Sequence, residues 1–375
     1  MSEPELKPAE VEEFRVGATT GGGGFKTRPL FKLMVEKRAS DLFFTSHSPI
    51  KIKIEGHIHA INKQVLMPDA VRAAAFSLMT PEQITYFQRE LEIDFAISEP
   101  GLGRFRCAIF YQRGFPAMVM RYITAEMPRL EDLGLPDTLS DLAKLKRGLV
   151  LMVGATGSGK STTLAAMVNF RNENFSDHII TIEDPIEFLH TNKRSIINQR
   201  EVGLDTKTYA RALKGAMRAA PDVILIGEIR DRESMEAAIS LAGTGHLVFA
   251  TLHANNCAET LDRIINMFPH QQHPQILLDL SQYLRAIVAQ RLVPGADGRR
   301  AAAVEVMLNT PHISDLIRKG DVSTIKEAIQ LSGEKGVQSF DHSLLELFKA
   351  GRVSMDDALI NADSRTNLEA KINFG

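Results

Sequence analysis

The strongest signal in this chain is the stretch Gly154-Ala155-Thr156-Gly157-Ser158-Gly159-Lys160-Ser161-Thr162, which fits the pattern GxxxxGK[ST]. It follows an apolar run and precedes a segment with the apolar spacing of a helix. In this pattern the glycines let backbone N–H groups turn towards phosphate oxygens, the lysine reaches the β- and γ-phosphates, and the serine hydroxyl ligates Mg²⁺. The stretch therefore predicts a site for ATP and Mg²⁺, in which Lys160 binds phosphate and Ser161 binds the metal.

Four apolar runs, separated by segments of helical periodicity, lie in the same part of the chain. They cover residues 149–153, 178–182, 223–226 and 247–250. Short apolar strands that alternate with helices are typical of a parallel sheet covered by helices, which is an α/β fold. Ligands of such sheets bind at the carboxyl ends of the strands. The pattern after residue 258 is largely helical.

Acidic residues follow two of these predicted strands. Glu183 and Glu187 come at and after the end of one, and Glu228 follows another, with Gly227 at the position where an acid is usual. ATP hydrolysis needs a carboxylate that orients and deprotonates water and an acid that holds the magnesium shell. We expect Glu183 and Glu187 to be candidates for these roles and Glu228 to act on magnesium. Solvated acidic turns are the alternative interpretation.

Two histidines, His246 and His253, flank the last of the apolar runs. On an unbroken strand, residues seven positions apart point to opposite faces, and no third ligand is nearby in the sequence. The pattern therefore favours roles in sensing phosphate or positioning neighbours over a metal site. A core position is the alternative for each histidine.

The chain divides by composition into four parts. Residues 1–28 carry Glu, Pro, Lys and a run of four glycines, which predicts a flexible tail. Residues 29–124 predict a small α+β domain, in which Thr80-Pro81-Glu82-Gln83 has the pattern of a helix start. Prolines punctuate a linker at 125–147, and the nucleotide-binding domain follows at 148–375.

The end of the α+β domain carries a group of arginines. Three strands are expected there, at 92–97, 104–111 and 118–123. A phosphate-cleaving site often takes an arginine from a neighbouring domain or subunit to neutralise developing charge. The candidates are Arg104, Arg106, Arg113 and Arg121.

Composition excludes several other classes of protein. A formal net charge of -2 over 375 residues provides no strong field for a polyanion, so nucleic acid is a poor partner. Cys107 and Cys257 lie far apart, which indicates a reducing compartment, core positions and no structural zinc. No apolar run reaches the roughly 18 residues of a membrane span, and the N-terminus is acidic, so the cytoplasm is the expected location.

Together the four motifs resemble those of the secretion ATPase superfamily, where they are called the Walker A, Asp box, Walker B and His box motifs. Within it the chain resembles the PilT/PilU-type retraction ATPases of the type IV pilus, from about Leu30 to the end. The shared segments are Ser40-Asp41-Leu42, Gly103-Arg104-Phe105-Arg106, Asn198-Gln199-Arg200-Glu201-Val202-Gly203 and Thr251-Leu252-His253-Ala254-Asn255-Asn256. Residues 148–151, 201–206 and 309–320 are more similar to the PilU branch than to the PilT branch.

One departure from the PilT branch concerns function. His312-Ile313-Ser314 stands where PilT-like chains carry Ala-Ile-Arg, a region tied to retraction. The resemblance therefore implies an accessory retraction ATPase that works with a PilT-like ATPase. The long N-terminal extension and four-cysteine zinc module of the extension and secretion ATPases are not expected here.

The resemblance also implies a fold and residue roles. It implies a PAS-like domain at 29–124 and a RecA-like ATPase domain at 148–375 with a helical C-terminal part, assembled as a homohexamer with nucleotide between the domains. Lys160 would grip the phosphates, Glu187 would be the catalytic glutamate, and Glu228 would act through magnesium. The remaining implied positions are Arg106 and Arg121 towards the phosphates, with Arg104 and Arg113 weaker, Ser161 and Glu183 near magnesium, and His246 and His253 in the His box.

The function implied is an ATP-hydrolysing motor for pilus retraction and twitching motility. It would act in the cytoplasm, at the inner-membrane face of the pilus machine, on a membrane platform protein. Two alternatives stay open: a nucleotide-gated adaptor ring, and an ATPase for pilus extension or secretion. A nucleic-acid translocase is disfavoured by the near-neutral charge.

Overall fold

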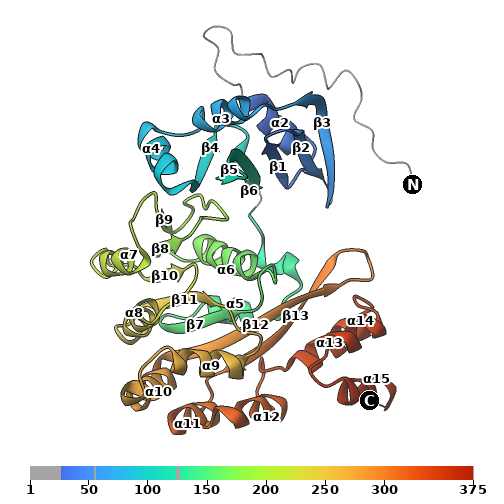
Figure 1. Cartoon of the computed structure of the whole chain (residues 1–375). Coiled ribbons are helices and arrows are strands. Elements are labelled where there is room, and N and C mark those ends of the chain that lie inside the picture. Colours follow the sequence, from blue (N-terminus) through green and yellow to red (C-terminus); the bar gives the residue numbers. More distant parts are fainter. Residues whose placement is uncertain (1–26, 55, 124–126, 375) are drawn as a thin grey trace. The chain divides into compact units, whose positions relative to one another are not determined.

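The computed structural model describes residues 27–54, 56–123 and 127–374, which belong to two compact units divided after Ala125 (Figure 1). The tail expected at 1–28 falls almost entirely on residues outside this description. Within the described residues, no helix has both the length and the apolar character needed to cross a membrane.

The first unit is an antiparallel sheet of six strands with helices packed on it. The strand order is β3-β2-β1-β6-β5-β4. Its core includes Phe31 and Phe105, whose rings stack 4.3 Å apart, and the buried Cys107. The elements are α2 (Arg28–Glu36), β1 (Asp41–Thr45), β2 (Pro49–Ile54), β3 (His57–Val65), α3 (Pro68–Phe76), α4 (Pro81–Glu90), β4 (Glu92–Glu99), β5 (Gly103–Gln112) and β6 (Phe115–Ile123).

Sequence patterns located several of these elements. The three strands expected at 92–97, 104–111 and 118–123 are β4, β5 and β6. Helix α4 begins with the expected capping box, because the Thr80 hydroxyl accepts from the Gln83 N–H and the Gln83 side chain accepts from the Thr80 N–H.

The second unit is built on a sheet of seven strands in the order β13-β12-β7-β11-β10-β8-β9. All neighbours are parallel except β12 and β13. The strands are β7 (Gly148–Val153), β8 (His178–Glu183), β9 (Ile196–Glu201), β10 (Val223–Ile226), β11 (Leu247–Leu252), β12 (Leu284–Pro294) and β13 (Arg300–Leu308). The expected parallel α/β sheet is therefore present, and β7, β8, β10 and β11 are the four strands foreseen.

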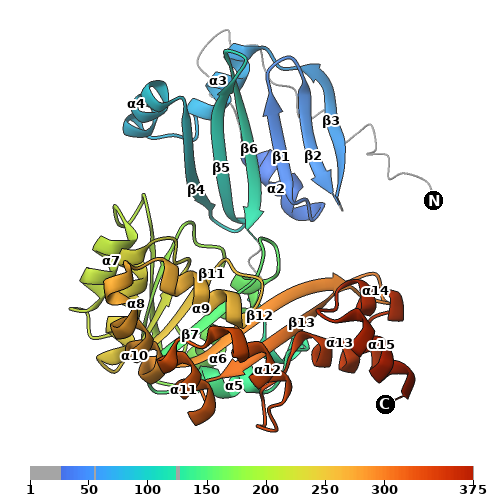
Figure 2. The same cartoon turned by 60° about the horizontal axis from the view of Figure 1, so that its bottom comes forward.

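Helices cover both faces of this sheet (Figure 2). Alternate residues of β7 show the arrangement: Leu149, Leu151 and Val153 pack against one group of helices, whereas Val150 and Met152 pack against the other. The second group is α5 (Thr138–Ala143) and α6 (Lys160–Asn174), and the first contains α7 (Tyr209–Ala216), α8 (Arg232–Gly243), α9 (Cys257–Asn266) and α10 (His273–Tyr283).

The expectation of a largely helical chain after residue 258 is wrong for 284–308, which forms the long antiparallel pair β12 and β13. Apolar runs rich in Ala, Val and Leu occur both in buried strands and in buried helices. Their periodicity therefore could not distinguish a strand from a helix here. Helices follow the pair: α11 (Pro311–Lys319), α12 (Ile325–Gln330), α13 (Phe340–Lys349), α14 (Met355–Ile360) and α15 (Arg365–Phe374).

Candidate nucleotide-binding site

The loop between β7 and α6 is held in a shape that only glycines allow. Gly154, Gly157 and Gly159 have φ angles of 151°, 78° and 88°. A Cβ on Gly154 would lie 2.4 Å from the carbonyl oxygen of Gln290, and one on Gly159 would lie 2.7 Å from Nε2 of the same residue. The loop is therefore pressed against β12, and its backbone is fixed in position.

Lys160 occupies the interior of this loop. Its Nζ donates to the carbonyl oxygens of Gly154 and Ala155, at 2.8 Å each. Burial lowers the pKa of Lys160, and the charges of Glu228 and Glu187 partly oppose that effect. The cation thus lies at the N-terminus of the 15-residue helix α6, in a loop whose shape suits phosphate.

Two hydroxyls of the loop suit a phosphate ligand and its magnesium ion. Within the described part of the chain, Oγ of Ser158 is buried and has no hydrogen-bond partner. A buried hydroxyl without a partner is costly unless a ligand supplies one. The hydroxyl of Ser161 and the carboxylates beside the loop are oxygen donors, which is the donor type that Mg²⁺ prefers.

Glu183 ends β8 and is held by side chains of two strands. Its Oε1 accepts from Thr181 Oγ1 at 2.6 Å and from Gln199 Nε2 at 3.2 Å. Burial raises the pKa of Glu183, and these hydrogen bonds partly oppose the effect. Glu183 is therefore a fixed carboxyl group, suited to orienting neighbours.

Glu187 lies four residues further along and is exposed. Its charge reaches Lys160 and Glu183, since it contributes to the pKa of both. Across the described residues, its carboxylate makes no hydrogen bond or ion pair. Glu187 therefore differs from Glu183, whose carboxylate is held by two side chains.

Glu228 is held from two sides at the end of β10. Its Oε1 lies 2.8 Å from Nε2 of His253, and its other oxygen accepts from Nε of Arg230. Arg230 also reaches Asp184, at 3.4 Å. The carboxylate is thereby fixed at the carboxyl edge of the sheet, where ligands of parallel sheets bind.

The glycine that replaces the usual acid before Glu228 has a steric cause. A Cβ on Gly227 would lie 3.1 Å from Cα of Glu183, 3.2 Å from the carbonyl oxygen of Ile182 and 3.2 Å from the Tyr209 hydroxyl. The Gly227 N–H donates to that Ile182 oxygen at 2.7 Å. A larger side chain at this position would therefore require these neighbours to shift by a few tenths of an ångström.

The structure separates the two histidines of the His box. His253 follows the carboxyl end of β11 and binds Glu228, whereas His246 precedes the strand. Nδ1 of His246 lies 3.0 Å from the Leu241 oxygen and 3.1 Å from the Thr244 hydroxyl, at the end of α8. Six strand residues span about 20 Å, so only His253 lies with the acids.

The candidate arginines all lie in the first unit. Arg106 and Arg121 face each other across β5 and β6, and they pair with Asp94 at 3.1 Å and Asp41 at 2.8 Å. Arg104 is buried and Arg113 lies at the β5–β6 turn with a φ of 51°. The loop, the acids and the histidines belong to the second unit.

Sequence reasoning missed three residues that organise the site. Gln290 of β12 packs on the loop and accepts from Thr163 at 2.8 Å, and Arg230 fixes Glu228. Arg291 lies 2.8 Å from Asp363 Oδ1 and 3.5 Å from the carbonyl oxygen of Asn255, two residues after the histidine that binds Glu228. Arg230 sits inside a motif, but no pattern marks Gln290 or Arg291, because β12 was not foreseen.

This loop, on a parallel sheet whose carboxyl edge carries three acids, defines the class of P-loop nucleotide-binding proteins. Residues 27–307 match the family described as Type II/IV secretion system protein, and the chain belongs to this family. It is 50% identical to the type IV pilus ATPase PilU of Pseudomonas aeruginosa over 92% of this chain and 91% of that one. It is 40% identical to the PilT retraction ATPase of the same organism over 88% of this chain and 96% of that one.

A solved structure agrees with these sequence comparisons. The crystal structure of the pilus retraction motor PilT with bound ADP matches with a TM-score of 0.86 and 40% identity, over 92% of this chain and 99% of that chain. The expected resemblance to PilT/PilU-type ATPases is confirmed, and so is the fold class, a RecA-like parallel-sheet domain preceded by a smaller α+β domain.

Proposed function

We propose that this chain is an ATP-hydrolysing motor subunit that powers retraction of a type IV pilus. The observation that carries the proposal is Glu228, fixed by His253 and Arg230 beside a complete phosphate-binding loop. Relatives named as pilus ATPases, at 50% and 40% identity over most of the chain, support the same activity.

In this proposal the nucleotide lies on residues 154–162. Backbone N–H groups of the loop, the buried Ser158 hydroxyl and Lys160 bind the phosphates. Ser161 and Glu228 hold Mg²⁺, and Glu183 orients their neighbours. Magnesium, when bound, neutralises charge on the β- and γ-phosphates.

Glu187 is the proposed catalytic base. Its carboxylate has no partner in the described part of the chain, whereas Glu183 and Glu228 are each held by two side chains. As the oxygen of the attacking water bonds to the γ-phosphorus, the bond from that phosphorus to the β–γ bridging oxygen breaks and ADP leaves. The free carboxylate accepts the proton of the water.

Arg106 and Arg121 are proposed to neutralise charge on the phosphates. Both side chains are more than one-third exposed and are paired with carboxylates in the present structure. The Arg106–Asp94 pair is exposed on both sides and therefore weak, so exchange of Asp94 for phosphate costs little. Asp41 is buried, so exchange at Arg121 leaves a buried carboxylate without its cation and costs more. A change in position of the first unit on nucleotide binding would bring these arginines to a site and convert hydrolysis into movement.

The proposed assembly is a homohexameric ring in the cytoplasm, at the inner-membrane face of the pilus machine. Its partners would be a PilT-like ATPase and the membrane platform protein. The domains proposed are a tail at 1–28, a PAS-like domain at 29–124, a linker at 125–147 and the ATPase domain at 148–375. An accessory role is favoured by His312-Ile313-Ser314, which stands where PilT-like chains carry Ala-Ile-Arg.

Retraction in cells tests the proposal. Cells that lack this chain are compared with cells in which only Glu187→Ala is present, while purified protein is assayed for phosphate release. Loss of retraction in both strains, with loss of phosphate release, is the expected result. Full retraction with the inactive Glu187→Ala chain would instead identify a nucleotide-gated adaptor ring.

A further inference from the structure

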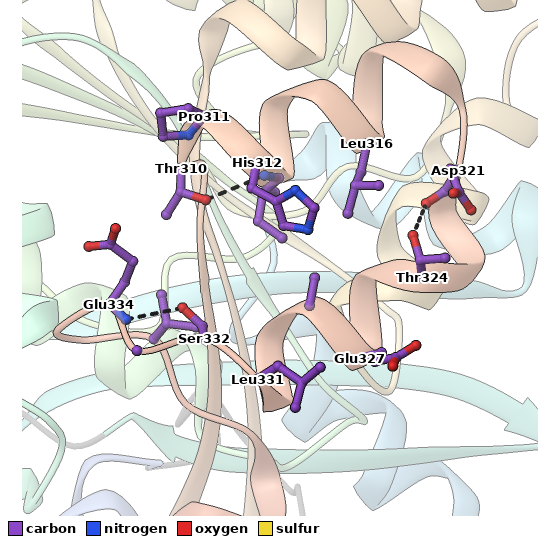
Figure 3. Close-up of a pocket in the computed structure, with 14 residues that line it drawn as sticks. Thr310, Pro311, His312, Leu316, Asp321, Thr324, Glu327, Leu331, Ser332 and Glu334 are labelled. Atoms are coloured by element: carbon purple, nitrogen blue, oxygen red, sulfur yellow. Dashed lines mark hydrogen bonds between the residues drawn. The ribbon is translucent and has the colours of Figure 1, made fainter.

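A cavity of about 780 Å³ lies among the C-terminal helices of the second unit (Figure 3). It is formed by α11, the short helix Val322–Thr324, α12 and residues 331–337. None of the nucleotide-site residues described above lines it. We call it the α11–α12 groove.

The groove combines apolar side chains with carboxylates. Its apolar lining includes Leu316, Ala328, Val337 and Leu331, and 78% of Leu331 is exposed to solvent. Contact of such an exposed leucine with water is unfavourable, so covering it with a partner would be favourable. The acidic side chains that line the groove are Asp321, Glu327 and Glu334.

In the parts of the chain that the structure describes, none of these three carboxylates is paired with a basic side chain, and His312 is the only basic side chain among the lining residues. Two neighbouring cations are engaged elsewhere: Lys319 pairs with Asp315 at 2.6 Å, and Lys326 pairs with Asp363 at 3.0 Å. Lys335, which follows Glu334, is exposed and offsets one of the three negative charges.

We propose that the α11–α12 groove binds a partner protein through a segment that carries Lys or Arg beside apolar side chains. The apolar lining would bury the apolar side chains of that segment, and the carboxylates would pair with its cations. A cavity of this size accepts several side chains at once.

The charge of the chain's own N-terminal segment makes that segment a poor ligand for the α11–α12 groove. Residues 1–26 contain five Glu against three Lys or Arg, so the segment is acidic like the groove. A basic segment of another protein has the complementary charge. The proposal concerns binding alone and does not depend on ATP hydrolysis.

Binding of synthetic peptides to the full chain tests the proposal. A fluorescent peptide of Lys and Leu is compared by anisotropy with peptides of the same length made of Glu and Leu, or of Lys and Ser. We expect only the Lys–Leu peptide to bind, and hydrogen exchange to slow within 310–337. Measurement without nucleotide keeps the result separate from the proposed hydrolysis.

Matched substitutions locate the site. Leu331→Ser is expected to weaken binding roughly tenfold, whereas Ile360→Ser, at a residue 75% exposed outside the groove, is expected to leave it unchanged. The double variant Glu327→Gln/Glu334→Gln should weaken it similarly, and Glu369→Gln on α15 should not. Thermal unfolding confirms that each variant folds.

Three results would overturn the proposal. Equal binding of the Lys–Ser peptide would show general attraction to an acidic surface, and equal weakening by the control variants would place the peptide elsewhere. Sedimentation that changes with Leu331→Ser, without any change in peptide binding, would show that the groove contacts a second copy of the chain.

Discussion

Nε2 of His253, after β11, lies 2.8 Å from Oε1 of Glu228, after β10. The histidine fixes an acid that would act on magnesium, and loss of such a partner typically costs tenfold to hundredfold in activity. We expect His253→Ala to lower kcat for ATP hydrolysis by roughly that factor, and His253→Gln to recover part of it. His246→Ala should cause a smaller loss, because His246 contacts Leu241 and Thr244 instead. Equal losses would contradict this role.

Lys160 should determine how nucleotide affinity depends on pH. Its pKa is lowered by burial, so it loses its charge at a lower pH than an ordinary lysine with a pKa of about 10.4. Phosphate binding needs the cation, so the Kd for ATP should rise as the pH becomes alkaline. Lys160→Ala should weaken binding by roughly a hundredfold at neutral pH. Titration of a fluorescent ATP analogue measures both effects.

The matched controls for Lys160 are a conservative and a distant substitution. Lys160→Arg should remove the alkaline weakening, because arginine stays charged, although its planar group fits the loop less well. Lys144→Ala removes an exposed lysine that pairs with Asp141 and should bind ATP as the parent does. An alkaline weakening that persists in Lys160→Arg would mean that another group causes it.

Gly227→Ala should disturb both strands that carry the acids. Its Cβ would meet Cα of Glu183 at 3.1 Å, and backbone atoms give way only at a cost. We expect a loss of about 1–3 kcal/mol in the free energy of unfolding and a large loss of kcat. Gly215→Ala is the matched control: its Cβ meets only Nη1 of Arg200 at 3.4 Å, on α7, so a gain of about 0.5–1 kcal/mol is expected. Chemical denaturation measures both.

The ion pair of Arg291 with Asp363 should make stability depend on acid pH. Burial alone would raise the pKa of Asp363, but hydrogen bonds from Lys326 and Arg291 lower it below its usual value. Because the pKa of Asp363 is lower in the folded chain than in the unfolded chain, its ionised form stabilises the fold at pH values above the unfolded-state pKa of about 3.9. This stabilisation is lost as the pH falls through the folded-state pKa.

Asp363→Asn tests this dependence. At neutral pH the variant should lose roughly 2 kcal/mol, because Arg291 and Lys326 lose their partner in a half-buried site. The difference from the parent should shrink as the pH falls below about 4. Denaturation with urea at several pH values measures it. A difference that is constant with pH would refute the assignment to the ion pair.

Local patterns predicted the parts of the site that lie within one stretch of sequence. The glycine-lysine loop, the acid that ends β8 and the acid after β10 each combine a motif with its strand, so 154–162, Glu183 and Glu228 could be chosen as candidates from the sequence. The roles of the same residues stay predictions until they are tested.

Contacts between distant stretches were not predictable. Gln290 closes the loop from β12, about 130 residues later, on a strand whose apolar run resembles a helix. The separation of His246 from His253, by contrast, agrees with the strand that the apolar run between them predicted. The α11–α12 groove depends on how three short helices pack, which no single pattern contains.

Nζ of Lys160 donates to the carbonyl oxygens of Gly154 and Ala155. The backbone of the loop therefore holds the ammonium group in place. These two oxygens and a phosphate would be rival acceptors for the same N–H donors, which limits how tightly Lys160 alone can bind phosphate.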